Sequence, residues 1–272
     1  MKQMPSTTFN YLGSNYTILG YSDKDHIFKQ IVLKNCFYEI RTLEVIKNLN
    51  LRGTYIDIGS NIGNHSIFFL NECKSSYLYS IEANAKLIPI LQKNLFENNF
   101  GKKAYSIFDC VISTKEVVYF HNKIDSNNIG MSYFSEIYSG DKDVEVKKGI
   151  SLDYLLTTIK PTSKVKLIKI DVEGQELDVL ASSSEILNQY KPFICVEIFP
   201  ENYPKVSKFL RKNNYICYKI ISQNYIFANK YSFQFYFLIL LDKIKTLKKI
   251  LFKSINLFRT FLENIKRLIR NI

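Results

Sequence analysis

The chain of 272 residues contains only five cysteines, and their spacing does not suit a metal site. The sequence has no CxxC pair and no combination of cysteine and histidine with the spacing of zinc ligands. The odd number of thiols, most of them inside apolar runs, predicts buried cysteines in a reducing compartment. We therefore expect no metal ligands among Cys36, Cys73, Cys110, Cys195 and Cys217.

Long apolar runs are also missing. Residues 1–10 lack the apolar core of a signal peptide. The longest apolar run, Phe235–Leu241, is far shorter than the roughly 20 residues that span a bilayer. These absences lead us to expect a cytoplasmic protein.

Positive charge is in excess, at a formal net charge of +12, but it is unevenly distributed. Nine basic residues and only two acidic ones lie between positions 241 and 272. More than half of the excess therefore belongs to the C-terminal tail. The basicity of the whole chain consequently says little about an active site in the remainder.

Short β-branched or aromatic runs alternate with helix-compatible stretches through the middle of the chain. This alternation predicts an α/β fold of the Rossmann-like type, with a doubly wound, mostly parallel sheet of seven strands. We expect an N-terminal extension over 1–40, the main domain over 41–230 and a helical tail over 231–272. The predicted strands are Thr54–Ile58, Tyr77–Ile81, Ala104–Ile112, Val165–Ile170, Phe193–Ile198, Tyr215–Ile221 and Tyr225–Asn229.

A glycine-containing turn follows the first predicted strand of the sheet. Gly59 ends the strand, and a helix is expected to begin near Gly63. Glycine lets the backbone approach a ligand closely, and the helix N-terminus attracts anionic groups. Glu82 follows the second strand, 23 residues after Gly59. This spacing is close to the ~20 residues expected of an acid that binds ribose hydroxyls.

The same turn argues against a dinucleotide, because asparagine occupies positions 61 and 64, where that fingerprint has glycine. S-adenosylmethionine contains ribose and adenine but no pyrophosphate, so it tolerates this turn. Asp57, at the end of the strand, is a candidate for binding the ammonium of this cofactor. For His65 we favour a hydrogen bond to the loop backbone, with acid–base catalysis as the alternative.

A second group of carboxylates follows the fourth and fifth strands. Asp171 and Glu173 are expected at the carboxyl edge of the sheet, facing the same crevice as the glycine turn, with Glu197 on the neighbouring rim. Carboxylates gathered in this way raise one another's pKa, and this favours a general base for an acceptor hydroxyl. Binding of a divalent cation is the alternative. A structural role, in which some of these carboxylates cap helices or pair with Lys169, is a further alternative. We favour the structural role for Glu176 and a functional role for Asp171.

These residues belong to motifs that resemble the FkbM-type class I methyltransferases. The resemblance covers roughly residues 53–230, and Leu167–Glu176 is its most specific part. It implies S-adenosylmethionine-dependent O-methylation, with acceptors that range from macrolides to sugars. The other motifs that carry it are Tyr55–Ser66, Ile81–Asn84 and Ile150–Asp153.

The family pattern also implies which residues bind the cofactor, and it extends to Asp109, which would face the adenine. It names no settled catalytic residue, so Asp171 and Glu173 remain inferences from the chain itself. We expect residues 120–149 and the first 40 residues to determine acceptor specificity. The cofactor-binding residues implied by the family are Asp57, Gly59, Asn61, Gly63, Glu82 and Asp109.

In the tail, apolar residues recur in steps of three or four from Ile244 to Ile272, with lysine and arginine between them. This pattern predicts a basic amphipathic helix. We favour binding to an anionic membrane surface. Self-association as a coiled coil is the alternative, although glutamate partners for it are scarce. Nucleic acid is not expected, because the apolar stripe exceeds what phosphate contact requires.

The leading functional hypothesis is an O-methyltransferase that acts on a glycan, a lipid-linked sugar or a related small acceptor at the cytosolic membrane face. Two alternatives stay open. One alternative is a nucleic-acid methyltransferase. The sequence argues against it, because the enzymes that methylate amino groups of bases resemble one another in an Asn/Asp-Pro-Pro-aromatic segment, whereas this chain has Asp-Val-Glu-Gly at 171–174. The other alternative is a non-catalytic scaffold that keeps the fold.

Overall fold

The computed structural model describes residues 4–121, 133–135 and 144–240, and beyond these residues 243–244, 247–248, 252, 254–256 and 259. The chain forms two compact units, Met1–Asn229 and Lys230–Ile272. The domain limits that we predicted at residues 40 and 230 stay predictions.

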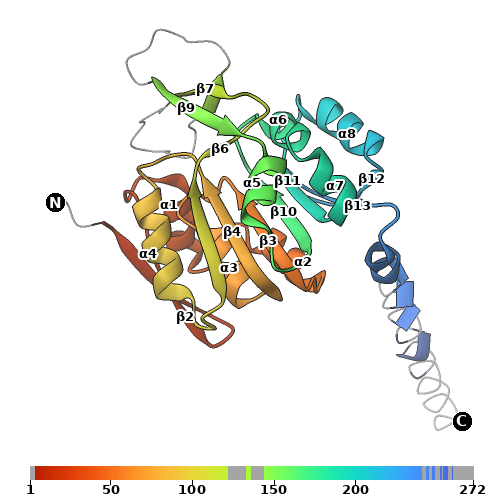
Figure 1. Ribbon diagram of the computed structural model, residues 1–272. Helices are drawn as coiled ribbons and strands as arrows, with labels where there is room; N and C mark the ends of the chain where they lie inside the picture. The colour runs from red at the N-terminus through yellow and green to blue at the C-terminus, as the bar shows by residue number, and fades with distance from the viewer. Residues whose placement is uncertain are drawn as a thin grey trace, which may run out of the picture. The chain divides into compact units, whose positions relative to one another are not determined.

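A seven-stranded sheet forms the centre of the first unit (Figure 1). Its strands are β3 (Gly53–Ile58), β4 (Ser75–Glu82), β5 (Ala104–Asp109), β10 (Val165–Ile170), β11 (Phe193–Glu197), β12 (Tyr215–Ile221) and β13 (Asn224–Asn229). Their order across the sheet is β12-β13-β11-β10-β3-β4-β5. All pairs are parallel except the two that involve β13. The predicted seven-stranded, mainly parallel α/β sheet is confirmed.

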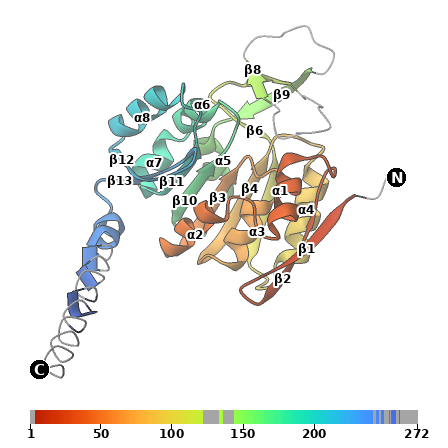
Figure 2. The same cartoon turned by 180° about the vertical axis from the view of Figure 1, so that it is seen from behind.

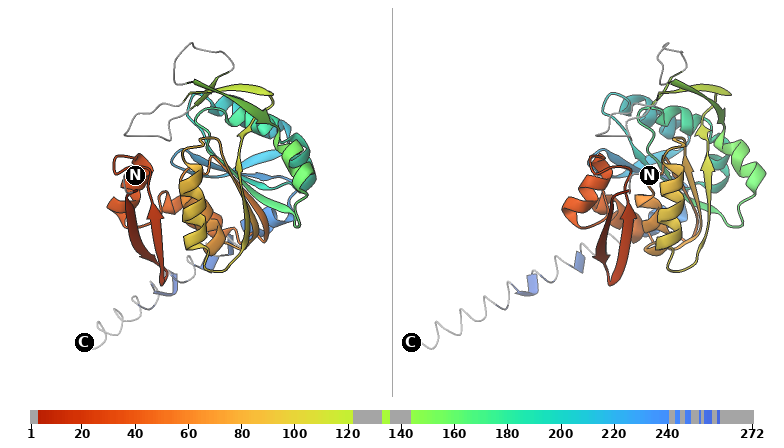
Figure 3. Two further views of the ribbon diagram at one scale, coloured as in Figure 1. Left: turned by 60° about the vertical axis from the view of Figure 1, so that its left-hand side comes forward. Right: turned by 90° about the vertical axis from the view of Figure 1, so that its left-hand side faces the viewer.

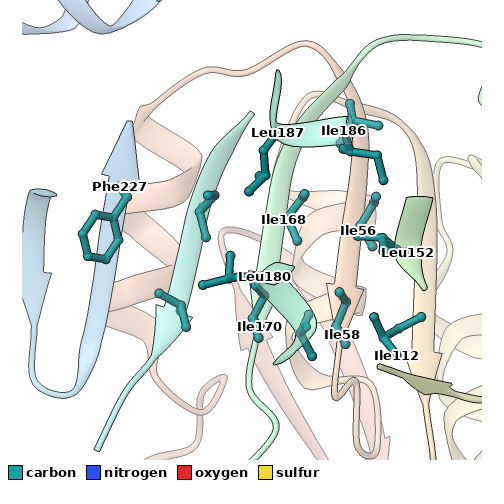
Figure 4. Close-up of a cluster of buried hydrophobic side chains, with 14 of the residues drawn as sticks. Ile56, Ile58, Ile112, Leu152, Ile168, Ile170, Leu180, Ile186, Leu187 and Phe227 are labelled. Atoms are coloured by element: carbon teal, nitrogen blue, oxygen red, sulfur yellow. The ribbon is translucent and has the colours of Figure 1, made fainter. Parts of the chain in front are cut away.

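Helices cover both faces of this sheet (Figure 3). One face carries α2 (Ile40–Asn48), α3 (Asn64–Asn71) and α4 (Ile88–Asn98), and the other carries α5 (Leu152–Ile159), α6 (Glu176–Ala181), α7 (Ser184–Tyr190) and α8 (Tyr203–Lys212). All six residues of β3 are buried, as expected for a parallel strand covered on both sides. Figure 4 shows the core between the sheet and α5–α7, which includes Ile56, Ile58, Ile168, Ile170, Leu152, Leu180, Ile186 and Leu187.

The N-terminal segment adds a further layer outside α4 (Figure 2). It consists of the hairpin β1 (Ser6–Tyr11) and β2 (Ser14–Leu19), followed by α1 (His26–Lys34). The buried side chain of Asn94 attaches this layer, because its Oδ1 accepts from the Leu19 N–H at 2.8 Å and its Nδ2 donates to the Leu19 carbonyl at 3.0 Å. Nδ2 also donates to the Ile62 carbonyl at 2.8 Å, so the same amide joins the extension to the glycine turn.

The predicted strand Ala104–Ile112 is interrupted at Cys110. Only its first part, β5, belongs to the central sheet; its last two residues form β6 (Val111–Ile112), which pairs with a different strand. That strand belongs to a four-stranded sheet of order β6-β9-β7-β8, with β7 (Val117–His121), β8 (Tyr133–Ser135) and β9 (Val144–Ile150). The interruption therefore redirects the chain at the carboxyl edge of the central sheet.

The helical stretch after β10 is divided into α6 and α7. In a continuous helix, the Val179 carbonyl would accept from the backbone N–H of Ser183. Here it accepts instead from the hydroxyls of Ser182 and Ser183, at 2.8 and 2.6 Å. The Ser151 hydroxyl caps α5, because it accepts from the Tyr154 N–H.

In the second unit, residues 233–240 are helical, and so are the described positions between 243 and 259. Phe233, Phe237 and Leu240 are exposed there. None of the helices in the described residues is long and apolar enough to cross a membrane. Most of the predicted amphipathic stripe lies outside the described residues, so a continuous helical tail stays a prediction.

Candidate active site

An open pocket lies at the carboxyl edge of the central sheet, where β3 and β10 run side by side and the chain continues to opposite sides of the sheet. Such a switch point is where open α/β sheets bind ligands. The pocket holds about 1030 Å³ of empty space, including solvent at its mouth. Five predicted site residues line it, namely Gly59, Asn61, Glu82, Asp171 and Glu173, and Glu197 lies beside them.

Gly59 is required by the fold as well as by any ligand. Its φ is +78°, and a Cβ at this position would lie 1.8 Å from the carbonyl oxygen of Asp171. The two strand ends are also joined by a bond from the Asp171 N–H to the Ile58 carbonyl at 3.0 Å. A side chain at position 59 would therefore push apart the strands that form the base of the pocket.

Glu82 fixes the shape of the turn that follows Gly59. Its Oε2 accepts from the Asn61 N–H at 2.7 Å, and its Oε1 accepts from the Asn84 N–H at 2.8 Å. Burial raises the pKa of Glu82, although the backbone N–H groups that donate to it act in the opposite direction. The carboxylate has about four acceptor sites and three backbone N–H groups donate to it, including that of Ala83, so Glu82 can also accept from a ligand hydroxyl.

Three predicted cofactor residues do not line the pocket. Asp57 is fully buried beneath the turn, where it accepts from the Ser66 hydroxyl at 2.5 Å. Gly63 precedes α3 with a φ of +91°, and a Cβ there would lie 2.8 Å from the side chain of Leu91. The Asp109 carboxylate is half exposed and lies 3.7 Å from a lysine of β9. Their roles at the cofactor stay predictions.

Lys169 lies beneath the pocket and was not among the predicted site residues. Its ammonium is 2.9 Å from Asp171 Oδ2 and 3.8 Å from Asp57 Oδ1, and its side chain is 2% exposed. Burial would lower the pKa of Lys169, but the two carboxylates outweigh burial and raise it. Burial would likewise raise the pKa of Asp171, but Lys169 outweighs it and the pKa is lowered. Asp171 is therefore held as a carboxylate.

Glu173 and Glu197 behave differently from Asp171. Burial, followed by the negative charges of Asp171 and Glu176, raises the pKa of Glu173 to about 7. Burial, followed by Asp171 and Glu39, raises the pKa of Glu197 to about 8. Glu173 can thus exchange a proton near neutral pH, as a general base requires. The predicted increase in pKa is found for Glu173 and Glu197 but not for Asp171, whose pKa is lowered.

Glu176 has the structural role that we favoured. Its Oε1 accepts from the Gly174 N–H at 2.6 Å, which closes the turn between β10 and α6. Glu173 sits in this turn with a φ of +50°, a conformation that non-glycine residues adopt infrequently. The turn therefore fixes the direction in which the backbone of Glu173 leaves β10.

The segment before α2 completes the pocket, with His26, Ile27 and Tyr38 in its lining. The Asn64 side chain holds this segment in place, because its Oδ1 accepts from the Tyr38 N–H at 2.9 Å and its Nδ2 donates to the Tyr38 carbonyl at 3.1 Å. The expectation that the first 40 residues influence specificity agrees with this placement. Which of those residues reach the pocket could not be read from the sequence.

The favoured interpretation of His65 is not what the structure shows. Its Nε2 lies 3.2 Å from Glu39 Oε2 rather than against the loop backbone. Glu39 Oε1 accepts from the Asn224 side chain at 2.6 Å, so this carboxylate joins α3 to the start of β13. Glu39 has a φ of +55° and was not singled out from the sequence, because its partners are distant along the chain.

The family model described as "Methyltransferase FkbM domain" matches residues 57–217. The chain belongs to the FkbM methyltransferase family. The match begins at Asp57 and contains the glycine turn, Glu82 and the Asp171–Glu176 segment, which are the parts that form the pocket. No curated protein matches the chain.

Several solved methyltransferases are similar to this FkbM-family chain. A methyltransferase FkbM from Methylobacillus flagellatus is 14% identical with a TM-score of 0.42; the match covers 65% of this chain and 44% of that one. A tRNA m1G37 methyltransferase from M. jannaschii is 13% identical with a TM-score of 0.45, over 84% and 54% of the two chains. M. jannaschii TYW2, solved in complex with AdoMet, is 10% identical with a TM-score of 0.39, over 84% and 85%. The chain thus spans less than half of the Methylobacillus protein, and these likenesses concern the fold alone.

The site offers no obvious place for a metal ion. Within the part of the chain that the structure describes, no group of three or more histidine, cysteine, aspartate or glutamate side chains is arranged to hold one. Asp171 pairs instead with the ammonium of Lys169, and the pKa values of Glu173 and Glu197 are raised. The divalent-cation alternative therefore gains no support from the geometry.

Proposed function

We propose that this chain transfers a methyl group from S-adenosylmethionine to a hydroxyl of a sugar, a glycan or a related small molecule. Membership of the FkbM family supports methyl transfer. The observation that carries the rest is the pocket itself, which joins a ribose-binding carboxylate, Glu82, to a titratable carboxylate, Glu173, at one edge of the sheet.

The residues at the β3–β4 end fit a nucleoside. Asn84 lines the pocket beside Glu82, and its buried Nδ2 has no hydrogen-bond partner within the described residues. A buried donor without a partner is costly, so a bound ligand that accepts from it gains affinity. Apolar side chains of Leu87, Val111 and Ile112 lie in the same lining and suit a flat adenine ring.

The chemistry requires a proton acceptor for the hydroxyl, because the oxygen must lose its proton as it forms the new bond to carbon. The cofactor supplies a methyl group activated by its sulfonium. Glu173, with a pKa of about 7, is the proposed base. Asp171 stays ionised, and its negative charge helps to raise the pKa of Glu173. Glu197, with a pKa of about 8, is mainly protonated at neutral pH and can donate a hydrogen bond to the acceptor.

Isothermal titration calorimetry with S-adenosylmethionine tests the cofactor half of the proposal. We expect saturable binding by the full chain and at least a tenfold loss of affinity in Glu82→Gln, because an amide donor would then face a backbone N–H. Glu201→Gln is the matched control, since Glu201 is exposed and does not line the pocket. Absence of binding by the unmodified chain would exclude the proposal.

Transfer of a labelled methyl group tests the acceptor half. We expect label in carbohydrate or small-molecule fractions, and loss of that label in Glu173→Gln with cofactor binding intact. The lining residues of the pocket include neither lysine nor arginine within the described part of the chain, and this disfavours a phosphate-rich acceptor. Label in RNA or DNA alone would support the nucleic-acid alternative.

We also propose that the tail binds an anionic membrane surface, on the basis of its basic amphipathic pattern and the exposed Phe233 and Phe237. Cosedimentation of the full chain with vesicles gives the test. Vesicles with 30% phosphatidylserine should bind the chain, neutral vesicles should not, and Phe233→Ser with Phe237→Ser should weaken binding. Equal binding to both vesicle types, or dimerisation without vesicles, would favour the coiled-coil alternative.

A further inference from the structure

The lining of the pocket is acidic at both ends. Glu82 lies at the β3–β4 end, and Asp171, Glu173 and Glu197 lie at the β10–β11 end. Within the described residues, lysine and arginine are absent from the lining. The pocket therefore presents an excess of carboxylates to its ligands.

Lys169 does not neutralise this excess. Its ammonium is buried beneath the pocket and is shared by Asp171 and Asp57, so its single charge faces two carboxylates. The described lining contains no lysine or arginine that could pair with Glu173 or Glu197. The negative charge of Asp171 raises the pKa of both glutamates. A ligand that brings positive charge to this end would lower the pKa of both glutamates and bind to their ionised forms.

The cofactor is poorly placed to reach Glu197. The proposed ribose-binding residue, Glu82, ends β4, whereas Glu197 ends β11, and β3 and β10 lie between these strands. Neighbouring strands are about 4.8 Å apart, so the two carboxylates are separated by roughly 14 Å of sheet. Glu197 thus belongs to the side of the pocket that is left for the acceptor, and Asp171 and Glu173, which follow β10, lie between it and the proposed cofactor site.

Tyr38 lines the pocket with these carboxylates. Carboxylates together with an aromatic ring are the groups by which proteins bind ammonium ions. We propose that the acceptor carries a primary amine close to the hydroxyl that is methylated, and that its ammonium binds among Asp171, Glu173 and Glu197. An amino sugar with a free amine has this chemistry. The inference rests on the proposed function, because it names the acceptor class of the same site.

Binding isotherms in the presence of S-adenosylhomocysteine test the inference without methyl transfer. The probes are glucosamine and galactosamine, their N-acetyl derivatives and glucosamine 6-phosphate. We expect the free amines to bind at least tenfold more tightly than the N-acetyl forms at pH 7, and the phosphate to bind more weakly than glucosamine. Equal or tighter binding of the N-acetyl forms would overturn the inference, and so would failure of all the free amines to bind.

Substitutions test whether the carboxylates at β10–β11 cause the preference for free amines. Glu197→Gln should reduce the ratio of amine to N-acetyl affinity at least fivefold while leaving S-adenosylmethionine binding unchanged, and Glu201→Gln should leave both unchanged. If Glu197→Gln instead lowers the affinity for S-adenosylmethionine and leaves the preference for amines unchanged, the carboxylates bind the cofactor and the inference is wrong. Cofactor binding and transfer to neutral hydroxyl acceptors, without a preference for amines, would overturn the inference alone and leave the proposed function standing.

Discussion

Replacement of Lys169 by methionine tests the charge balance on which the site depends. The side chain is 2% exposed, and the substitution removes the cation that lies 2.9 Å from Asp171 and 3.8 Å from Asp57. Removing one partner of a buried ion pair costs about 3–5 kcal/mol. Asp171 is 22% exposed and Asp57 keeps its bond from Ser66, so we expect the lower end, about 3 kcal/mol. That is a large part of the ~5–15 kcal/mol of a typical domain.

Urea unfolding of four proteins gives the measurement: the unmodified chain, Lys169→Met, Asp171→Asn and the double variant. The double variant should be more stable than Lys169→Met, because the carboxylate that lost its partner is then neutral. The coupling free energy of the cycle should exceed about 1 kcal/mol. A loss below about 1 kcal/mol in Lys169→Met, or additive effects in the double variant, would refute the argument.

The ion pair also predicts how the free energy of unfolding of these proteins changes with pH. The pKa of Asp171 is lowered in the folded chain, so its contribution to stability is present above its unfolded pKa and is lost as the pH falls through the folded value. Without Lys169, the main influence that lowers the pKa of Asp171 is lost, and burial, which raises it, is opposed by the weaker effects of His65 and Glu197. The stability difference between the unmodified chain and Lys169→Met should therefore shrink as the pH is lowered from 7 toward 4.

Two further predictions concern neighbouring residues. The pKa values of Glu173 and Glu197 are raised to about 7 and 8, so the unfolding free energy should decrease as the pH rises from about 4.5 through 8, and Glu197→Gln should flatten that decrease in urea titrations. Gly59→Ala should abolish folding or cofactor binding, because its Cβ would collide with the Asp171 carbonyl. Gly174→Ala, with a φ of +102° but its nearest atom 3.8 Å away, should lose only about 1–2 kcal/mol in thermal melts. Similar losses in both glycine variants would contradict the steric explanation.

The parts of the fold that follow from local patterns could be predicted from the sequence. All six residues of β3 are buried, and most of them are apolar or aromatic, apart from Thr54 and Asp57. A parallel strand covered on both faces is mainly apolar, so such a run can be recognised in the sequence. Gly59, Asn61 and Glu82 follow strand ends at the spacing that a nucleoside-binding turn requires. The parallel order of the sheet then brings Asp171 and Glu173 to the same edge.

The remaining features depend on contacts between distant residues. Tyr38 reaches the pocket because Asn64, 26 positions later, binds its backbone, and Glu39 meets Asn224, which is 185 positions away. The break at Cys110 is equally hidden, because β6 leaves the central sheet to pair with β9, far along the chain. No local pattern distinguishes such residues from ordinary surface or core positions. The sequence offers Lys169 as a partner for the carboxylates of this site, but an isolated lysine in a strand gives no sign of being buried.

The pKa of the proposed base depends on a residue that we do not assign as the proton acceptor. After burial, the negative charge of Asp171 is the main influence that raises the pKa of Glu173 and of Glu197. Asp171→Asn should therefore lower both, by about one pH unit for a neighbouring charge. The pH midpoint of the residual methyl transfer should shift to acid pH, and a ¹³C titration of labelled glutamate side chains should give the same shift when activity is low. Glu201→Gln should leave the midpoint unchanged. A midpoint that stays near pH 7 or rises in Asp171→Asn would mean that burial alone sets the pKa of Glu173, and that the carboxylates act independently.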